Sequence, residues 1–127
     1  MMIKQLTVFL QNEAGRLEEL TSILGKNDIN ISAISIAESA EFGIVRMIVN
    51  DCDKAVKVLK ENEFSVKTVD VIGIETPDTP GSLCDTLKKF ASAGINVSYM
   101  YGYSTGGVAH IIMKVSDPDK ALSILSM

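Results

Sequence analysis

The sequence predicts an α+β protein made of two copies of one small unit, and three observations lead to this prediction. Sliding the chain against itself by 66 residues aligns residues 3–61 with 69–127 without a gap, and 12 of the 59 pairs are identical. Ordinary composition would give roughly three or four identities by chance. Each copy alternates strand-like and helix-like periodicity. Each also carries a polar-x-x-Gly-x-Leu stretch at the same place, Asn12–Leu17 and Asp78–Leu83. We therefore expect one unit over residues 1–69 and a second over residues 70–127.

The first unit reads as strand, helix, strand, strand, helix, strand. The alternating residues 3–10 predict the first strand, and Leu17, Leu20 and Leu24 mark the buried side of the helix that follows. Strands are expected over residues 29–38 and 44–49, with a turn over residues 39–43, and a last strand over residues 64–69. Asp51 is expected to cap the second helix. This βαββαβ order is ferredoxin-like and predicts an antiparallel sheet with both helices on one face.

The second unit repeats this order over strands 69–76, 95–104 and 108–115. Asp117 is expected to cap its second helix, with Pro118 at the first helical position. Met127 corresponds to Glu61, so residues 70–127 contain no segment for a fourth strand. We therefore expect the first strand of this unit to have an open edge, unless a partner chain, a swapped segment or a longer C-terminus covers it.

Composition and charge limit the function. Hydrophobic residues make up 46% and charged residues 22% of the chain, as in a soluble globular protein. A net charge of -4 argues against nucleic acid and anionic membranes as partners. No apolar run approaches the roughly 20 residues of a membrane span, and Met1–Gln5 lacks the pattern of a signal peptide. Cys52 and Cys84 fall in expected helices and are interpreted as buried thiols of a cytoplasmic protein.

The repeated motifs resemble those of the ACT domain, a family of small ligand-sensing modules of amino-acid metabolism. Asp78-Thr79-Pro80-Gly81-Ser82-Leu83 matches the D-x-P-G-x-L loop of that family, and Gly94-Ile95-Asn96-Val97 matches the stretch after its first helix. The first copy departs from the pattern at Asn12 and Ala14. The resemblance implies modules paired side by side, with a free amino acid held between the first loop of one module and the second strand of another. It also implies a free-standing sensor or regulatory subunit without catalytic activity or cofactor. A homodimer is expected from the unfinished second sheet and from the partly apolar sheet face away from the helices.

The resemblance places ligand contacts in the two loops and at the start of each second strand. These residues are Asn12, Glu13, Ala14, Gly15, Asn30 and Ile31 in the first unit, and Asp78, Pro80, Gly81, Asn96 and Val97 in the second.

The residues themselves suit an amino acid. A helix N-terminus after a glycine offers free N–H groups to a carboxylate, and Asn and Asp can accept hydrogen bonds from an ammonium. A plain capping role for Asn12 and Asp78 remains an alternative, and both roles can coexist. Because Asp78 would repel a carboxylate, we prefer the Asn12 loop for that group.

Other patterns indicate packing or turns. His110 is expected on the sheet face away from the helices as a solvated or satisfied histidine, with a ligand or pH contact as the alternative. Tyr99, Tyr101 and Tyr103 alternate along one strand and are expected to share a face with Val97. Gly102, Gly106 and Gly107 lack the Gly-Lys-Ser/Thr of a phosphate loop. A single histidine provides no catalytic triad, and the cysteine spacing is not that of a zinc site. We therefore expect no enzyme and no metal.

A second function remains open at this point. The sheet face away from the helices carries Phe9, Ile44, Ile48, Val71 and Ile112 among polar residues that include Gln5 and Thr7. This face is apolar enough to dock on an amino-acid biosynthetic enzyme, so that the chain would be an interaction subunit without a ligand of its own.

Overall fold

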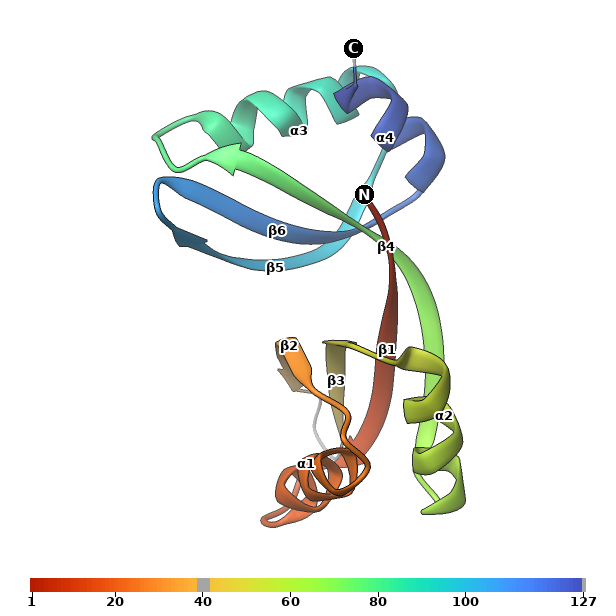
Figure 1. Ribbon diagram of the computed structural model, residues 1–127. Helices are drawn as coiled ribbons and strands as arrows, with labels where there is room; N and C mark the ends of the chain where they lie inside the picture. The colour runs from red at the N-terminus through yellow and green to blue at the C-terminus, as the bar shows by residue number, and fades with distance from the viewer. Residues whose placement is uncertain (39–41, 127) are drawn as a thin grey trace. The chain divides into compact units, whose positions relative to one another are not determined.

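The protein is α+β, with four helices and six strands in the part of the chain that the structure describes. The structure is a computed structural model, and it describes residues 1–38 and 42–126 (Figure 1). The expected turn over residues 39–43 falls partly on residues 39–41, outside the described residues. The elements run in the order β1 Met2–Gln11, α1 Arg16–Lys26, β2 Ile31–Glu38, β3 Phe42–Val49, α2 Cys52–Glu61, β4 Ser65–Pro77, α3 Ser82–Ser92, β5 Val97–Thr105, β6 Val108–Val115 and α4 Pro118–Leu125.

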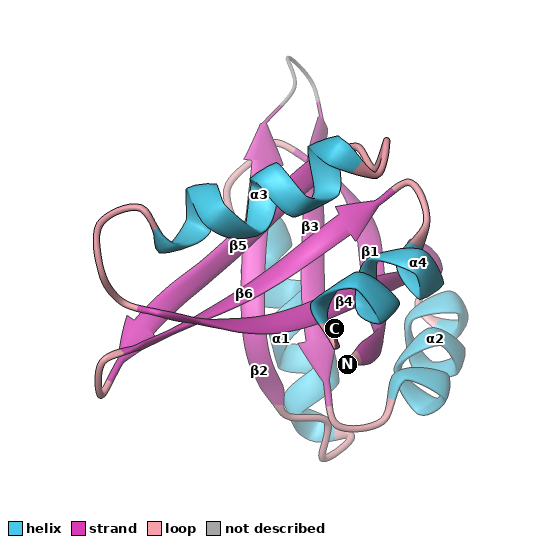
Figure 2. Cartoon of the chain, turned by 90° about the horizontal axis from the view of Figure 1, so that it is seen from above, coloured by secondary structure: helices cyan, strands magenta, loops and turns pink. Residues whose placement is uncertain are grey.

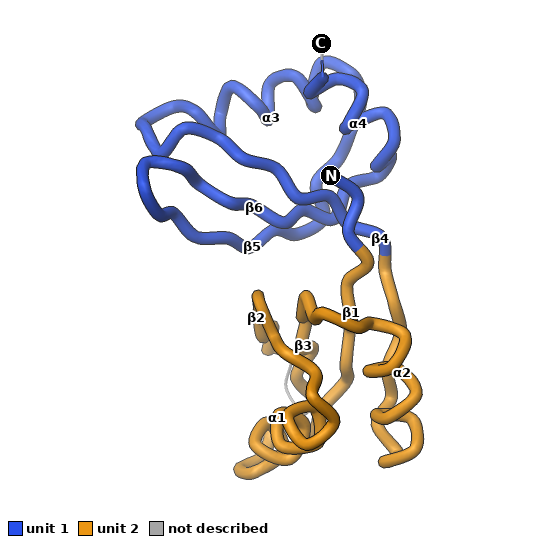
Figure 3. Tube along the Cα trace, viewed as in Figure 1, with its two compact units in different colours: residues 1–3, 70–127 blue, residues 4–69 orange. Residues whose placement is uncertain are grey.

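The chain divides into two compact units. One unit is Lys4–Val69, and the other combines Asp70–Met127 with Met1–Ile3 (Figure 3). Each has its own apolar core: Leu6, Leu20 and Leu59 belong to the first, and Ile72, Phe90 and Met113 to the second. The sequence placed residues 1–3 in the first unit, so the division differs at these three residues.

In the Lys4–Val69 unit the strand order is β2-β3-β1-β4, as expected for a ferredoxin-like sheet. β1 and β2 both pair antiparallel with β3. Leu6 and Val8 are buried beneath α1 and α2, whose inner sides contribute Leu20, Leu24 and Leu59. The helical spacing thus indicated the buried side correctly at Leu20 and Leu24, but Leu17, which was expected on the same side, is 37% exposed.

In the other unit, β6 lies between β4 and β5, and both neighbours pair with it antiparallel. Figure 2 shows α3 and α4 lying over these strands. Ile72 and Ile74 of β4 face the helices and join Phe90 of α3 and Ala121 of α4 in the core.

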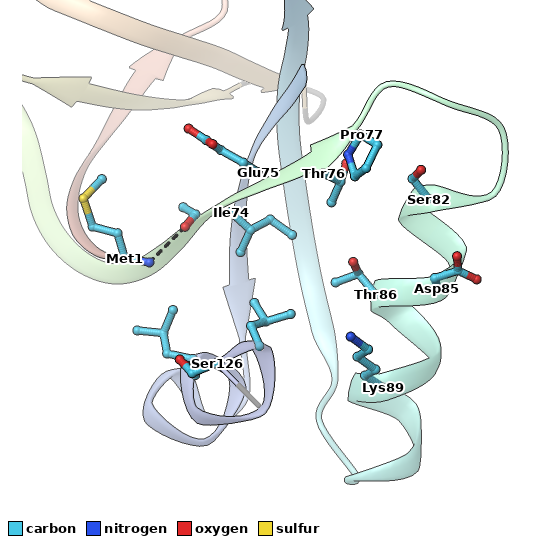
Figure 4. A pocket seen from close by; sticks show the side chains of 13 residues that line it. Met1, Ile74, Glu75, Thr76, Pro77, Ser82, Asp85, Thr86, Lys89 and Ser126 are labelled. Atoms are coloured by element: carbon cyan, nitrogen blue, oxygen red, sulfur yellow. Dashed lines mark hydrogen bonds between the residues drawn. The ribbon is translucent and has the colours of Figure 1, made fainter. Parts of the chain in front are cut away.

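Part of the edge of β4 in this unit is covered by residues 1–3, and Figure 4 shows the hydrogen bond of Met1 as a dashed line. The α-amino group of Met1 donates to the Gly73 carbonyl oxygen at 3.0 Å, and the Gly73 N–H donates to the Met1 carbonyl oxygen at 2.8 Å. Residues 1–3 therefore cover the edge of β4 as far as Gly73. Residues 1–3 belong to the first repeat of the sequence, so this part of the edge is covered by a segment from the other repeat.

A bulge interrupts the second strand of each unit at an identical serine. The pairing shifts between Ile31 and Ala33 and again between Val97 and Tyr99, which leaves Ser32 and Ser98 as the extra residues. Beyond the bulge Tyr99 pairs with Lys114 and Tyr103 with His110. The three tyrosines therefore lie on the sheet face away from the helices, opposite to the expected face, because the extra residue reverses the alternation.

Helix starts divide into two kinds. Asp51 and Asp117 accept a hydrogen bond from the backbone N–H of Lys54 and Lys120, both at 3.1 Å, so the predicted caps of α2 and α4 are confirmed. The N-cap residues of α1 and α3 are Gly15 and Gly81, without a side-chain cap. The capping alternative for Asn12 and Asp78 is therefore wrong, because the N-cap positions are occupied by Gly15 and Gly81, three residues later.

Candidate functional site

The two polar loops have the same backbone shape. Gly15 has φ 88° and ψ −14°, and Gly81 has φ 88° and ψ −13°, both in the left-handed region that glycine adopts without strain. All residues of both loops from the polar residue to the glycine are exposed. Since no side chain caps either helix, the first turns of α1 and α3 present backbone N–H groups at the positive end of the helix dipole.

The loops differ in the groups around this shared backbone. In the second loop the Asp78 N–H donates to the Gly107 carbonyl oxygen at 3.0 Å, and the Thr79 and Ser82 hydroxyls lie 2.6 Å apart. In the first loop Arg16 follows Gly15 directly, and its guanidinium pairs with Glu19 at 2.6 Å. The first loop therefore combines the neutral Asn12 and the carboxylate of Glu13 with a nearby cation that pairs with Glu19, whereas the second contains the carboxylate of Asp78 without such a cation beside its glycine.

Arg16, the first residue of α1, is a site candidate that was not among the residues expected from the sequence. Its guanidinium carbon lies 5.0 Å from the centre of the Phe64 ring, and its Nε is buried without a hydrogen-bond partner. The signal was available, since an arginine directly after the loop glycine occurs in the first copy only, where Ser82 stands in the second.

The start of each second strand is fixed by a matched pair of hydrogen bonds. The Asn30 N–H donates to Asn50 Oδ1 at 2.9 Å, and the Asn50 N–H donates to the Asn30 carbonyl oxygen at 3.2 Å. The Asn96 N–H donates to Ser116 Oγ at 2.9 Å, and the Ser116 N–H returns a bond of 2.9 Å to Asn96. Because backbone groups make these bonds, the side chains of Asn30 and Asn96 are left exposed. Ile31 and Val97, which follow them, are half-buried at the start of β2 and β5.

Within one unit the structure does not bring the loop and the second-strand asparagine together. Gln11, next to the first loop, pairs with Phe42 at one end of β3, whereas Ile31, next to Asn30, pairs with Val49 at the other end. Eight residues of extended strand at roughly 3.3 Å each separate the two ends by about 25 Å. The same arrangement holds in the second unit, where Pro77 pairs with Val108 and Val97 with Val115.

The outer strands of the sheet order are β2 and β5, and both carry uncovered apolar side chains. On β2, Ile34 is 45% and Ile36 53% exposed, and on β5, Met100 is 37% exposed. All three pair with buried residues of the core-facing side, so they extend the apolar side of each sheet beyond its helices. Exposed apolar strips of this kind mark interaction surfaces.

The sheet face away from the helices is less open than the sequence suggests. Gln5, Thr7 and Val71 are 0%, 4% and 0% exposed, and Gln5 Nε2 donates to Thr7 Oγ1 at 3.1 Å. His110 lies on this face as expected, 3.6 Å from a carboxylate oxygen of Glu75 and stacked on Tyr103 at 5.3 Å between ring centres.

Both cysteines were expected to be buried. Cys52 is only half-buried, and Cys84 is exposed. Burial raises the pKa of the Cys52 thiol, and the neighbouring carboxylate of Asp53 raises it further. Residues 1–38 and 42–126 hold no group of three or more His, Cys, Asp or Glu side chains that could bind a metal ion. No helix in these residues is long and apolar enough to cross a membrane.

Comparison with known proteins identifies the family of this chain. The chain belongs to the ACT domain pair family, whose model matches residues 1–127. It is 45% identical to a protein from Bacteroides thetaiotaomicron whose crystal structure has a TM-score of 0.94, covering 99% of this chain and 88% of that chain. No curated protein sequence matches it.

More distant structures show the same fold. The ligand-free regulatory subunit of aspartate kinase from Thermus thermophilus is 14% identical with a TM-score of 0.70, covering 97% of this chain and 90% of that chain. The corresponding subunit from Thermus flavus is 12% identical with a TM-score of 0.70, covering 99% and 94%. The fold inferred from the loop motifs is thereby confirmed.

Proposed function

We propose that this chain is a non-catalytic regulatory protein that binds a free amino acid between modules of two chains. The observation that carries the proposal is the pair of uncapped helix N-termini at Gly15 and Gly81, together with the position of Asn30 and Asn96 at the opposite end of each sheet. The loops supply N–H donors for a carboxylate, and the asparagine side chains supply donors and acceptors for an ammonium.

Pairing of two chains is part of the proposal, because a loop and an asparagine of one unit lie about 25 Å apart on an extended strand. When two edge strands run antiparallel side by side, the start of one lies beside the end of the other. An asparagine of one chain then faces a loop of its partner. The exposed Ile34, Ile36 and Met100 supply the apolar contact for this homodimer.

Of the two loops, we infer that the first takes the carboxylate. Asn12 is neutral, and Arg16 adds a cation beside the helix N-terminus. Asp78 would need a proton or a cation before a carboxylate could approach. The site residues proposed are those of the two loops and strand starts, with Arg16 added. The free thiols, one exposed, fit a reducing compartment such as the cytoplasm.

The proposal is tested by a thermal-shift screen of the twenty amino acids at millimolar concentration. We expect one or a few to raise the melting temperature. A ligand at a hundred times its Kd would stabilise by about 2.7 kcal/mol. Asn12→Ala is expected to reduce the shift more than Asp78→Ala. A flat screen would contradict amino-acid binding, and the reverse order of the two variants would contradict the choice of loop.

The dimer is tested separately with Ile34→Arg, which places a charge on the exposed apolar strip of β2. We expect this variant to be monomeric by light scattering and to lose the ligand response. Tyr103→Arg, at a 60% exposed aromatic on the other sheet face, is the matched control and should remain dimeric. A monomeric wild type that still binds an amino acid would contradict a site shared between chains.

A further inference from the structure

The two outer strands, β2 and β5, hold equivalent places in the repeat but carry side chains of opposite size. On the side of the helices, Ile34 and Ile36 of β2 are 45% and 53% exposed. The 66-residue register places Met100 and Gly102 at these positions of β5. The largest contrast is therefore at one position, where β2 has a protruding isoleucine and β5 has no side chain.

A cavity of about 250 Å³ lies at Gly102, and all of its lining residues belong to β5 and β6. They include Met100 and Ser104 on either side of the glycine, with Ile111 opposite it on β6. Pockets for small molecules measure roughly 300 to 1,000 Å³, so this cavity suits a single side chain better than a ligand. Residue 102 cannot supply that side chain, because a Cβ there would overlap the His110 carbonyl oxygen.

The other face of these two strands shows the reverse contrast. The side chains of β2 that face away from the helices are small, and those of β5 are large: Ala33, Ser35 and Ala37 correspond in the register to Tyr99, Tyr101 and Tyr103. Each strand is therefore large on the face where the other is small. Arginine at position 103 would keep a long side chain there, so Tyr103→Arg remains a valid control for the dimer.

These size profiles distinguish the possible pairings of edge strands. Side chains directly opposite each other on neighbouring antiparallel strands have Cβ atoms roughly 4.5 to 5.5 Å apart. Two β2 strands would place isoleucines together on one face and leave the other face underfilled. Two β5 strands would bring two cavities together and crowd the tyrosines. Only β2 beside β5 places large residues opposite small ones on both faces, as close packing requires.

We propose that β2 of one chain pairs antiparallel with β5 of a second copy, with Ile36 seated in the cavity at Gly102. This inference rests on the pairing of two chains proposed above, and it states which repeats meet. The same contact occurs twice in a two-fold dimer, so both outer strands of each chain are covered and no open edge remains to recruit further copies.

This pairing also decides which groups share an amino-acid site. Glu38, at the end of β2, pairs with Gly43, and Gln11, next to the first loop, pairs with Phe42, so both lie at one end of the sheet. An antiparallel β5 begins at that end, which brings the partner's Asn96 to the side of the Asn12 loop. Each site then combines a loop of one repeat with the asparagine of the other repeat.

Disulfide mapping of the full chain tests this pairing, in a background of Cys52→Ala and Cys84→Ala. With Ile36 opposite Gly102, the register places Ile34 opposite Ser104. A chain with Ile34→Cys and a differently tagged chain with Ser104→Cys are co-expressed and mildly oxidised. Because opposite residues are held at high effective concentration, we expect roughly tenfold or more mixed disulfide than with Lys88→Cys, an exposed helix position that measures random collision.

Two further variants complete the test. Ala37→Cys with Tyr101→Cys is a second pair, on the other face, in case the first pair does not fold. Ile36→Cys alone reports the alternative, because in a pairing of two β2 strands centred on residue 36 it faces its own copy. We expect it to form no disulfide with itself.

A disulfide of Ile36→Cys with itself would overturn the proposal, as would a dimer without the mixed disulfide of either pair, or a protein that is monomeric by light scattering. The cross-links are measured without any amino acid, so the result does not depend on a ligand. Mixed disulfides together with a flat amino-acid screen would support the pairing and contradict amino-acid binding. Disulfides between two β2 strands together with a responsive screen would do the reverse.

Discussion

Gly15 and Gly81 show how much the two loops depend on a single backbone conformation. Both have φ 88°, and a Cβ added at either would meet no atom within 4 Å. Space is therefore available for a side chain, and the left-handed φ alone favours glycine. The identity of these two residues across the repeat is explained by geometry before any ligand is considered.

Gly81→Ala is expected to lower the free energy of unfolding by roughly 1 to 2 kcal/mol, because alanine is strained in the left-handed region. Gly25→Ala is the matched control, since Gly25 lies within α1 and a Cβ there also meets nothing within 4 Å. Removing a helix glycine should stabilise by roughly 0.5 to 1 kcal/mol. Urea unfolding measures both. A neutral Gly81→Ala would show that the loop relaxes to another conformation.

At the residue scale, the sequence showed which residues form the loops better than it showed where each helix begins. The polar loops were found from their spacing, but Asn12 and Asp78 do not cap because a glycine occupies each N-cap. The separation of Asn12 from Asn30 could have been predicted. A strand followed by an antiparallel helix places the next strand's first residue at the far end of the sheet.

At the scale of elements, periodicity predicted each helix and strand, and it failed where a strand gains a residue. Tyr99, Tyr101 and Tyr103 were assigned to the wrong face because the bulge at Ser98 reverses the alternation. The alternation of apolar and polar residues is a property of one strand. A bulge is seen only in how that strand pairs with its neighbour, so the alternation does not reveal it. The same bulge occurs at Ser32 in the first unit, where the Ser32 hydroxyl donates to the Ile48 carbonyl oxygen at 3.2 Å.

The two kinds of helix start predict different losses of stability when the polar residue near the start is replaced by alanine. Asp51→Ala and Asp117→Ala each remove a side-chain cap and should cost about 1 kcal/mol of unfolding free energy. Asn12→Ala and Asp78→Ala remove no cap and should change stability by less than about 0.5 kcal/mol. Denaturant unfolding of the four variants without ligand makes the comparison. A large loss for Asn12→Ala would mean that its side chain stabilises the loop itself.

At the scale of the molecule, one strand and one terminus join the two repeats. β4 runs without a break from Ser65 to Pro77, so it is the last strand of one unit and the first of the other. Met1–Ile3 belongs to the unit of residues 70–127 although Lys4 belongs to the other. The sequence could not show this, because periodicity is local and the Met1–Gly73 pairing spans 72 residues.

Deletion of Met2 and Ile3 should therefore affect the unit that is distant in sequence. We expect the Gly73 amide, which donates to the Met1 carbonyl oxygen, to lose protection from hydrogen exchange. The amide of Met47, in the core of the Lys4–Val69 unit, should remain protected and is the internal control. Equal loss at both sites would show that the two units unfold together. Unchanged protection at Gly73 would contradict the pairing.

The pairing of Met1 with Gly73 also orders events during synthesis. Met1 is synthesised 72 residues before Gly73. The Lys4–Val69 unit is therefore complete, and able to fold, before Met1 can pair with Gly73. During that interval the N-terminal residues have no strand to join, and the edge of β4 that they later cover has yet to be made. A bulky fusion at the N-terminus would have to fit beside Gly73.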